Sequence, residues 1–202
     1  MSVCANAGTG CAFLGRSAVR TAFVAGALAG GTVLQSATAA EPELPPELAE
    51  VREAVAKYRD PLVAVRDGYF STLACVRYPD GNMGVHFLNT RLLGPEPDPM
   101  KPQILLYEVA DGGLQLAGVE WFVPLSTGVE STPQLFGQAF EGPMEGHEPI
   151  MPAALHHYDL HVWLFKNNPN GLFHHANPNV SCDGEWGYTV ELSPTDHVET
   201  SH

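Results

Sequence analysis

The sequence contains few basic residues, with 10 Lys and Arg against 23 Asp and Glu, which gives a formal net charge of −13. A chain this acidic repels phosphate backbones and anionic lipid head groups and attracts cations. We therefore expect no nucleic-acid partner, and we look for partners among metal ions and small molecules.

Long apolar runs are also missing, because no segment approaches the roughly 20 apolar residues of a membrane-spanning helix. The nearest, TAFVAGALAG at residues 21–30, follows Arg16 and Arg20 and precedes the small residues SATAA at 36–40. A basic region, a short apolar region and a small-residue end are the three parts of a secretory signal peptide. The alternative is a disordered tail behind a misassigned start codon.

This pattern predicts a signal peptide over residues 1–39, one globular domain over 40–193 and a flexible tail over 194–202. The protein would then be periplasmic or extracellular, with no membrane insertion after signal cleavage. Removing the signal leaves eight basic residues against 23 acidic ones, a net charge of −15.

Cysteine is scarce in the predicted domain, which contains only Cys75 and Cys182. In an oxidising compartment a lone pair of cysteines is most simply a disulfide bond. The alternative is a reactive or metal-binding thiol pair.

Common catalytic motifs are absent from the sequence. It has no G-x-S-x-G, H-E-x-x-H, Walker loop, G-x-G-x-x-G or C-x-x-C. These motifs would indicate serine hydrolases, zinc proteases, nucleotide binding or redox chemistry. The sequence therefore assigns no reaction, and whether the protein is an enzyme stays open.

The order of secondary structure predicts an α+β fold. Leu48, Val51, Val55 and Tyr58 recur at helical spacing, and Asp60-Pro61 can cap and open a second short helix that ends at Gly68. Runs of aromatic and β-branched residues bounded by turn residues then predict strands. They span residues 69–78, 84–88, 103–109, 114–123, 157–165 and 187–192. We expect N-terminal helices packed on a curved antiparallel sheet or open barrel.

Residues 124–155 show little periodicity and contain several Pro and Gly. A loop this long in a compact domain is often a lid or binding loop. Its apolar residues predict that it folds back and covers one end of the sheet.

Histidine is abundant, and all nine residues follow position 40. If residues 157–165 form a strand, His157, Asp159 and His161 share one face, with the two histidines about 13 Å apart. If they form a helix, His157 and His161 lie one turn apart and pair naturally. The Tyr, Val, Trp and Phe content favours the strand.

Two further strands each carry a potential metal ligand. Glu120 alternates with apolar residues, and a carboxylate on a buried face is costly unless it is paired or binds a metal. His86, Glu120 and His161 could thus converge on one interior point, with His157 and Asp159 as additional ligands. Two histidines and a carboxylate can hold copper, zinc or iron. Alternatively, His86 and His161 are half-buried and hydrogen-bonded within the core, and Glu108 and Glu120 pair with Arg77, Arg91 or a backbone amide. His147, His174 and His175 are expected to be solvated loop residues.

Two other functions stay open besides that of an exported metal-binding protein. One is a metal-free module for a small molecule, with a pocket under the long loop lined by Trp121, Trp163, Phe136 and Phe140. The other is a structural protein of the cell envelope. Nothing in the sequence indicates an oligomeric state.

Three segments together resemble a family of exported bacterial proteins with no established biochemical function. They are YPDGNMGVHF, ILLYEVADGGLQLAGVEWFVP and HYDLHVWLFKNNPNGLFHHANPNVSC. The likeness covers residues 54–182 and implies an exported single domain of this organisation, but nothing about catalysis. NMGVHF and HYDLH are also loosely similar to the paired histidine motifs of cupins, although the H-x-H of the first cupin motif is missing.

Overall fold

The computed structural model describes residues 41–110, 113–184 and 187–189. The predicted signal peptide and C-terminal tail lie outside these residues, so both stay predictions. None of the helices in the described part of the chain is long and apolar enough to cross a membrane.

The two predicted helices are present near the start of the described chain. Helix α1 spans Pro46–Val55, continues into a 3-10 turn, η1, at Ala56–Arg59, and is followed by α2 at Pro61–Arg66. Asp60 caps α2, because its side chain accepts a hydrogen bond from Leu62 N at 2.9 Å. The apolar stripe of α1 is buried, as its spacing predicts.

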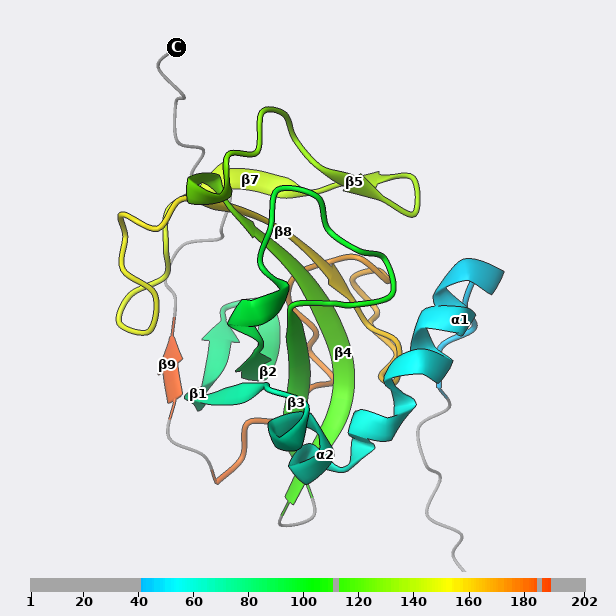
Figure 1. Cartoon of the computed structure of the whole chain (residues 1–202). Helices are drawn as coiled ribbons and strands as arrows, with labels where there is room; N and C mark the ends of the chain where they lie inside the picture. The colour runs from blue at the N-terminus through cyan, green and yellow to red at the C-terminus, as the bar shows by residue number, and fades with distance from the viewer. Residues whose placement is uncertain (1–40, 111–112, 185–186, 190–202) are drawn as a thin grey trace, which may run out of the picture. The chain divides into compact units, whose positions relative to one another are not determined.

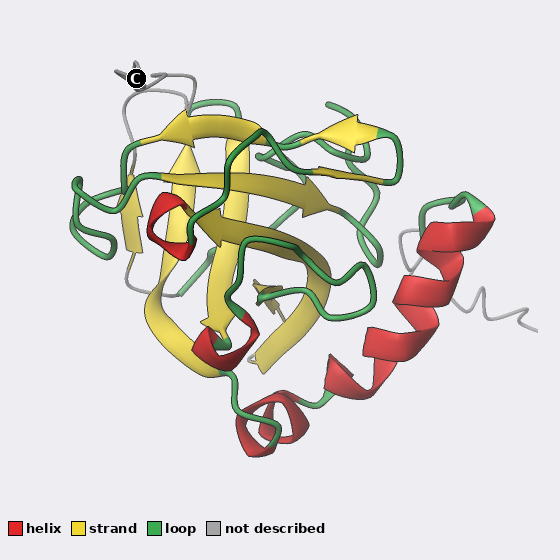
Figure 2. Cartoon of the chain, turned by 45° about the horizontal axis from the view of Figure 1, so that its top comes forward, coloured by secondary structure: helices red, strands yellow, loops and turns green. Residues whose placement is uncertain are grey.

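A curled seven-stranded sheet forms the body of the fold (Figures 1 and 2). Its strand order is β7-β8-β4-β3-β2-β1-β9, and neighbours are antiparallel except for the parallel pair of β1 and β9. The bounds are β1 Phe70–Tyr78, β2 Gly81–Leu88, β3 Ile104–Ala110, β4 Gly113–Pro124, β7 Glu141–Met144, β8 His157–Val162 and β9 Gly187–Thr189. A short 3-10 turn, η2, lies between β2 and β3 at Thr90–Leu92. The α+β prediction with a curved antiparallel sheet is confirmed.

The two faces of the sheet differ in composition. On one face, Trp121 of β4 and Leu160 of β8 join the main apolar core, which also contains Leu48 and Val51 of α1. Tyr107 of β3 links this face to the helices by donating a hydrogen bond to the Tyr58 carbonyl at 2.6 Å. The opposite face carries a smaller apolar cluster together with the histidines and carboxylates of β4 and β8.

The segment predicted as one long loop contains regular structure. Residues 124–155 include a 3-10 turn, η3, at Leu125–Thr127, a small hairpin of β5 Gln134–Leu135 and β6 Gln138–Ala139, and strand β7. Strand β7 extends the main sheet by pairing with β8. The last part, residues 145–155, which we call the covering segment, folds on itself through hydrogen bonds such as that from Met151 N to the His147 carbonyl at 2.9 Å. Several of its side chains line the cavity described below, so it covers part of the sheet as predicted.

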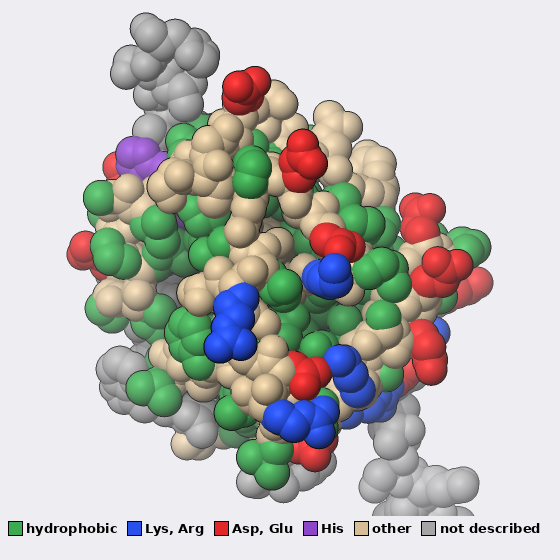
Figure 3. All heavy atoms as spheres, viewed as in Figure 1, with side chains coloured by type: hydrophobic (Ala, Val, Ile, Leu, Met, Phe, Trp, Pro, Cys, Tyr) green, Lys and Arg blue, Asp and Glu red, His purple; other side chains and the backbone are tan. Residues whose placement is uncertain are grey.

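The predicted disulfide is formed between Cys75 of β1 and Cys182, with the two Cα atoms 5.7 Å apart. On the face shown in Figure 3, acidic side chains are scattered over the surface, whereas Lys and Arg gather over its lower part. A buried disulfide and an acidic surface are compatible with an exported protein.

Candidate metal centre

A cavity of about 410 Å³ lies against the face of the sheet that is opposite the main apolar core. Apolar side chains form much of its wall, among them Phe70, Met83, Ile104, Phe122, Met151 and Leu155. Its polar lining includes His86, Glu120, His147, His157, Asp159 and His161. All five residues expected to bind metal therefore reach one cavity, together with His147.

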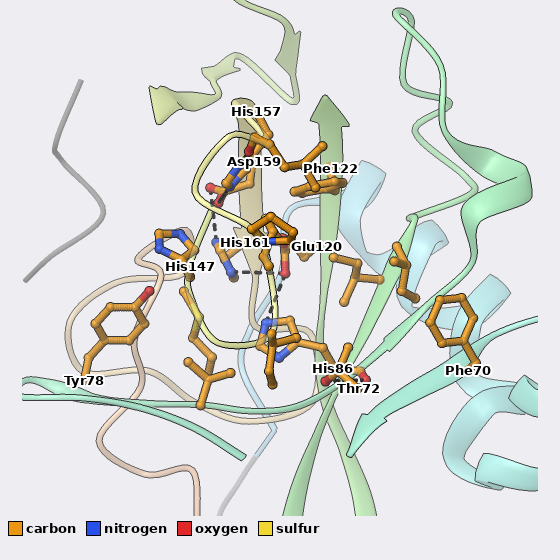
Figure 4. A pocket seen from close by; sticks show the side chains of 18 residues that line it. Phe70, Thr72, Tyr78, His86, Glu120, Phe122, His147, His157, Asp159 and His161 are labelled. Atoms are coloured by element: carbon orange, nitrogen blue, oxygen red, sulfur yellow. Dashed lines mark hydrogen bonds and ion pairs between the residues drawn. The ribbon is translucent and has the colours of Figure 1, made fainter. Parts of the chain in front are cut away.

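The sheet register brings His86, Glu120 and His161 together. Glu120 and His161 are direct cross-strand partners on β4 and β8. His86 lies on β2, separated from β4 by β3, so a flat sheet would hold it about 9–10 Å from β4. The curl of the sheet lets these side chains point toward one another across β3 (Figure 4).

The distances in this cluster match those between ligands of one ion. Oε2 of Glu120 lies 3.4 Å from Nε2 of His86 and 3.3 Å from Nε2 of His161. Two ligand atoms about 2.0–2.1 Å from a tetrahedral ion are themselves about 3.3 Å apart. The three ligand atoms all lie within 4.8 Å of one another. The predicted convergence is therefore present.

Two of these atoms are buried without a hydrogen bond. The side chains of Glu120 and His161 are 5% and 1% exposed. In the described part of the chain, Glu120 Oε2 and His161 Nε2 have no hydrogen-bond partner. Buried polar groups are nearly always satisfied, and these two atoms lie 3.3 Å apart without a hydrogen bond, so a cation between them could satisfy both.

The orientation of His86 supports the same conclusion. Its Nδ1 lies 3.3 Å from the Gly84 carbonyl oxygen, which can only accept a hydrogen bond. A neutral ring with its proton on Nδ1 would present Nε2, the atom nearest Glu120, to a metal ion. Fixing the tautomer through the second ring nitrogen is usual for histidines that bind metals.

The charges of the metal-free cluster are strongly coupled. Burial alone would raise the pKa of Glu120, but His161 and His86 outweigh burial and lower the pKa far below its usual range. Burial alone would lower the pKa of His161, but Glu120 and Asp159 raise this pKa to about 9. Glu120 is therefore ionised at neutral pH and needs a positive charge beside it, which a proton on His161 or a metal ion can supply.

The remaining two predicted ligands belong to a separate cluster. His157 and Asp159 share the face of β8 with His161, but the strand holds His157 too far along to join the first cluster. They instead meet His147 from the covering segment, with all three ligand atoms within 4.8 Å. His147 was expected to be solvated, and that expectation was wrong, because the covering segment turns it inward. Because its segment shows little periodicity, the sequence could not predict that the side chain of His147 points inward.

A third cluster lies outside the predicted set. Asp80, His174 and His175 bring ligand atoms within 4.8 Å of one another. The rings of the two histidines stack with centroids 4.5 Å apart, and His175 is buried. The expectation that both are solvated was therefore wrong for His175.

Glu108 is satisfied by other groups and is not a ligand. Both of its oxygens accept hydrogen bonds from Lys166 Nζ at 2.8 Å, and Ser181 N adds a contact of 3.3 Å. The sequence correctly suggested pairing with a backbone amide, but the cation is a lysine and not an arginine.

The four aromatic residues expected to line a pocket lie elsewhere. Trp121 and Phe140 belong to the main core, and Phe136 packs edge-on against Trp121 with ring centroids 5.2 Å apart. Trp121 follows Glu120 on β4 and so must face the other side of the sheet. Trp163 lies beyond the end of β8, where its Nε1 donates a hydrogen bond to the His174 carbonyl at 2.6 Å. None of the four lines the cavity that contains the histidines.

Comparison with known proteins gives no assignment, since no family model, no curated protein and no solved structure matches this chain. Its function must therefore be inferred from the chemistry of the cavity.

Proposed function

We propose that this chain is an exported metal-binding protein in which His86, Glu120 and His161 hold a divalent transition metal. The observation that carries the proposal is the buried, unsatisfied pair of Glu120 Oε2 and His161 Nε2, which His86 Nε2 approaches from a third strand. A cation at this point would satisfy all three atoms.

The donor set narrows the choice of ion. Two imidazole nitrogens and one carboxylate oxygen suit zinc, copper or iron better than calcium or magnesium, which prefer oxygen ligands. Three protein ligands also leave coordination positions for water or another small molecule. The cavity beside the cluster has room for such a molecule.

Export is supported by the disulfide and by the signal-like N-terminal sequence. The resemblance to exported bacterial proteins agrees with this location.

Elemental analysis of the purified protein tests the proposal. The full-length chain would be exported to an oxidising periplasm and purified without a polyhistidine tag, beside the variants His161→Ala and His156→Ala. His156 is a suitable control, because it neighbours the candidate residues but belongs to none of the three clusters. We expect His161→Ala to bind about one equivalent of metal less than the wild type, and His156→Ala to match the wild type.

Equal metal content in all three proteins, after incubation with copper, zinc and iron in turn, would overturn the proposal. Circular dichroism of each variant checks that a loss of metal does not reflect a loss of fold. His161→Gln is the alternative where the alanine variant fails to fold.

A second candidate function, metal-free binding of a small apolar molecule, is favoured by the walls of the cavity. Its volume of about 410 Å³ lies within the range of about 300–1,000 Å³ common for small-molecule sites. In that case the histidines and Glu120 form a charge-paired polar end, and an apolar fluorescent probe would bind the metal-free protein. Binding that requires added metal would favour the first proposal instead.

A further inference from the structure

We propose that the same cavity contains a second metal site, formed by His147, His157 and Asp159. This proposal goes beyond the proposed function, since its three ligands differ from those of the first site. Either site can therefore exist without the other, and the experiment below distinguishes the two failures.

The ligand atoms of the second site converge from two segments. His157 and Asp159 lie two residues apart on β8, and their side chains point to the same face of the sheet (Figure 4). Nε2 of His157 is 3.6 Å from Oδ2 of Asp159, and a ring nitrogen of His147 completes a set within 4.8 Å. Two ligands of one ion are about 3.3 Å apart, and the distance between His157 and Asp159 is close to this value.

The orientation of His157 matches that of His86. Its Nδ1 lies 3.1 Å from the Leu155 carbonyl oxygen and must donate a hydrogen bond to it. The lone pair of the neutral ring is therefore on Nε2, facing Asp159. Two histidines in different clusters thus have Nδ1 held by a backbone carbonyl and Nε2 turned toward a carboxylate.

Burial and unsatisfied atoms give independent support. The side chains of His157 and Asp159 are 1% and 3% exposed. His147 Nε2 is buried and, among the residues that the structure describes, has no hydrogen-bond partner. A buried carboxylate beside two imidazoles, one of them with an unsatisfied nitrogen, repeats the chemistry of the first site.

Asp159 connects the two sites. While its Oδ2 lies near His157, its Oδ1 is 3.6 Å from Nδ1 of His161. A carboxylate behind a ligating histidine orients the ring and increases its basicity. Asp159 is therefore a ligand of the second site and a positioning residue for the first.

The experiment counts zinc ions in the full-length exported protein and in three variants, after dialysis against zinc with a weak competing chelator. We expect His147→Ala and His86→Ala each to bind one ion fewer than the wild type, and His156→Ala to bind as many as the wild type. Any ion near His174 is common to all four proteins and cancels from these differences. His147 lies outside the strands, so its loss should leave the sheet folded, and His147→Gln repeats the test with a residue of similar size.

The pattern of losses separates the two proposals. If both His147 variants bind as many zinc ions as the wild type, the second site is overturned, whatever His86→Ala shows. If instead only the His147 variants lose an ion, the second site stands and the first fails. A wild type that binds no zinc overturns the second site.

Discussion

Two buried carboxylates on neighbouring strands illustrate how a structural residue differs from a candidate metal ligand. Glu108 on β3 and Glu120 on β4 are both 4% exposed. Burying a carboxylate is costly unless a partner compensates. Glu108 has its full compensation in Lys166 and a backbone amide. Glu120 has only imidazoles, and one of its oxygens is unsatisfied in the described chain, which is why we assign the metal to Glu120.

Asp159 carries the first prediction at the residue scale. Asp159→Asn keeps the size of the side chain but removes the charge behind His161, so the first site should bind zinc about 10–100-fold more weakly. Competition titration in the His147→Ala background measures this, since the second site is then disabled. The same substitution at the exposed Asp183, outside all three clusters, should leave the affinity unchanged. An Asp159→Asn protein that binds zinc as tightly as its parent would show that Asp159 does not position His161.

At the scale of elements, strand β2 depends on one glycine to present His86. Gly84 has a φ of +91°, and a Cβ atom at this position would clash with the backbone of Tyr107 on β3. Its carbonyl also holds Nδ1 of His86. The local backbone of β2 and the orientation of a metal ligand are thus set at the same residue.

Gly84→Ala is therefore expected to affect both stability and metal binding. The strained backbone should lower the free energy of unfolding by about 1–3 kcal/mol, with weaker zinc binding because His86 is displaced. Urea denaturation and zinc titration measure the two effects. Gly94→Ala is the matched control, since a Cβ atom added there would have no other atom within 4 Å and the φ of Gly94 is not in the left-handed region. Equal behaviour of the two variants would contradict this account of β2.

Alternation along strands made part of the site predictable from sequence. Glu120 and His161 could be placed on the inner faces of their strands because side chains alternate with a period of two residues. The same rule separates Trp121 from Glu120, so an aromatic pocket that included Trp121 could not also face the metal ligands. His147 could not be found, because its position depends on how an aperiodic segment folds over β8. The separation of His157 from His161 follows from their spacing along the strand, but the third ligand of the second cluster comes from that segment and could not be predicted.

At the scale of the whole molecule, one covalent bond joins distant parts of the chain. Cys75 and Cys182 are 107 residues apart, and Asn177 and Cys182 also form β-bridges with Asn82 and Val109 of the sheet. Closing a loop of about 100 residues removes unfolded-state entropy worth up to about 5 kcal/mol at 25 °C. None of the proposed metal ligands is a cysteine, so the bridge should stabilise the fold without taking part in metal binding.

Reduction of the disulfide should therefore lower the free energy of unfolding by several kcal/mol, up to about 5 kcal/mol, while the folded protein keeps its metal. Guanidinium denaturation with and without reductant measures the first effect, and zinc analysis under conditions where the reduced protein is still folded measures the second. The double variant Cys75→Ala/Cys182→Ala controls for other effects of the reductant, because its stability should not respond. Equal stability of the oxidised and reduced wild type would contradict the entropic role of the bridge. Zinc loss from the folded reduced protein would mean instead that the bridge holds the strands in the curvature that brings His86 to Glu120.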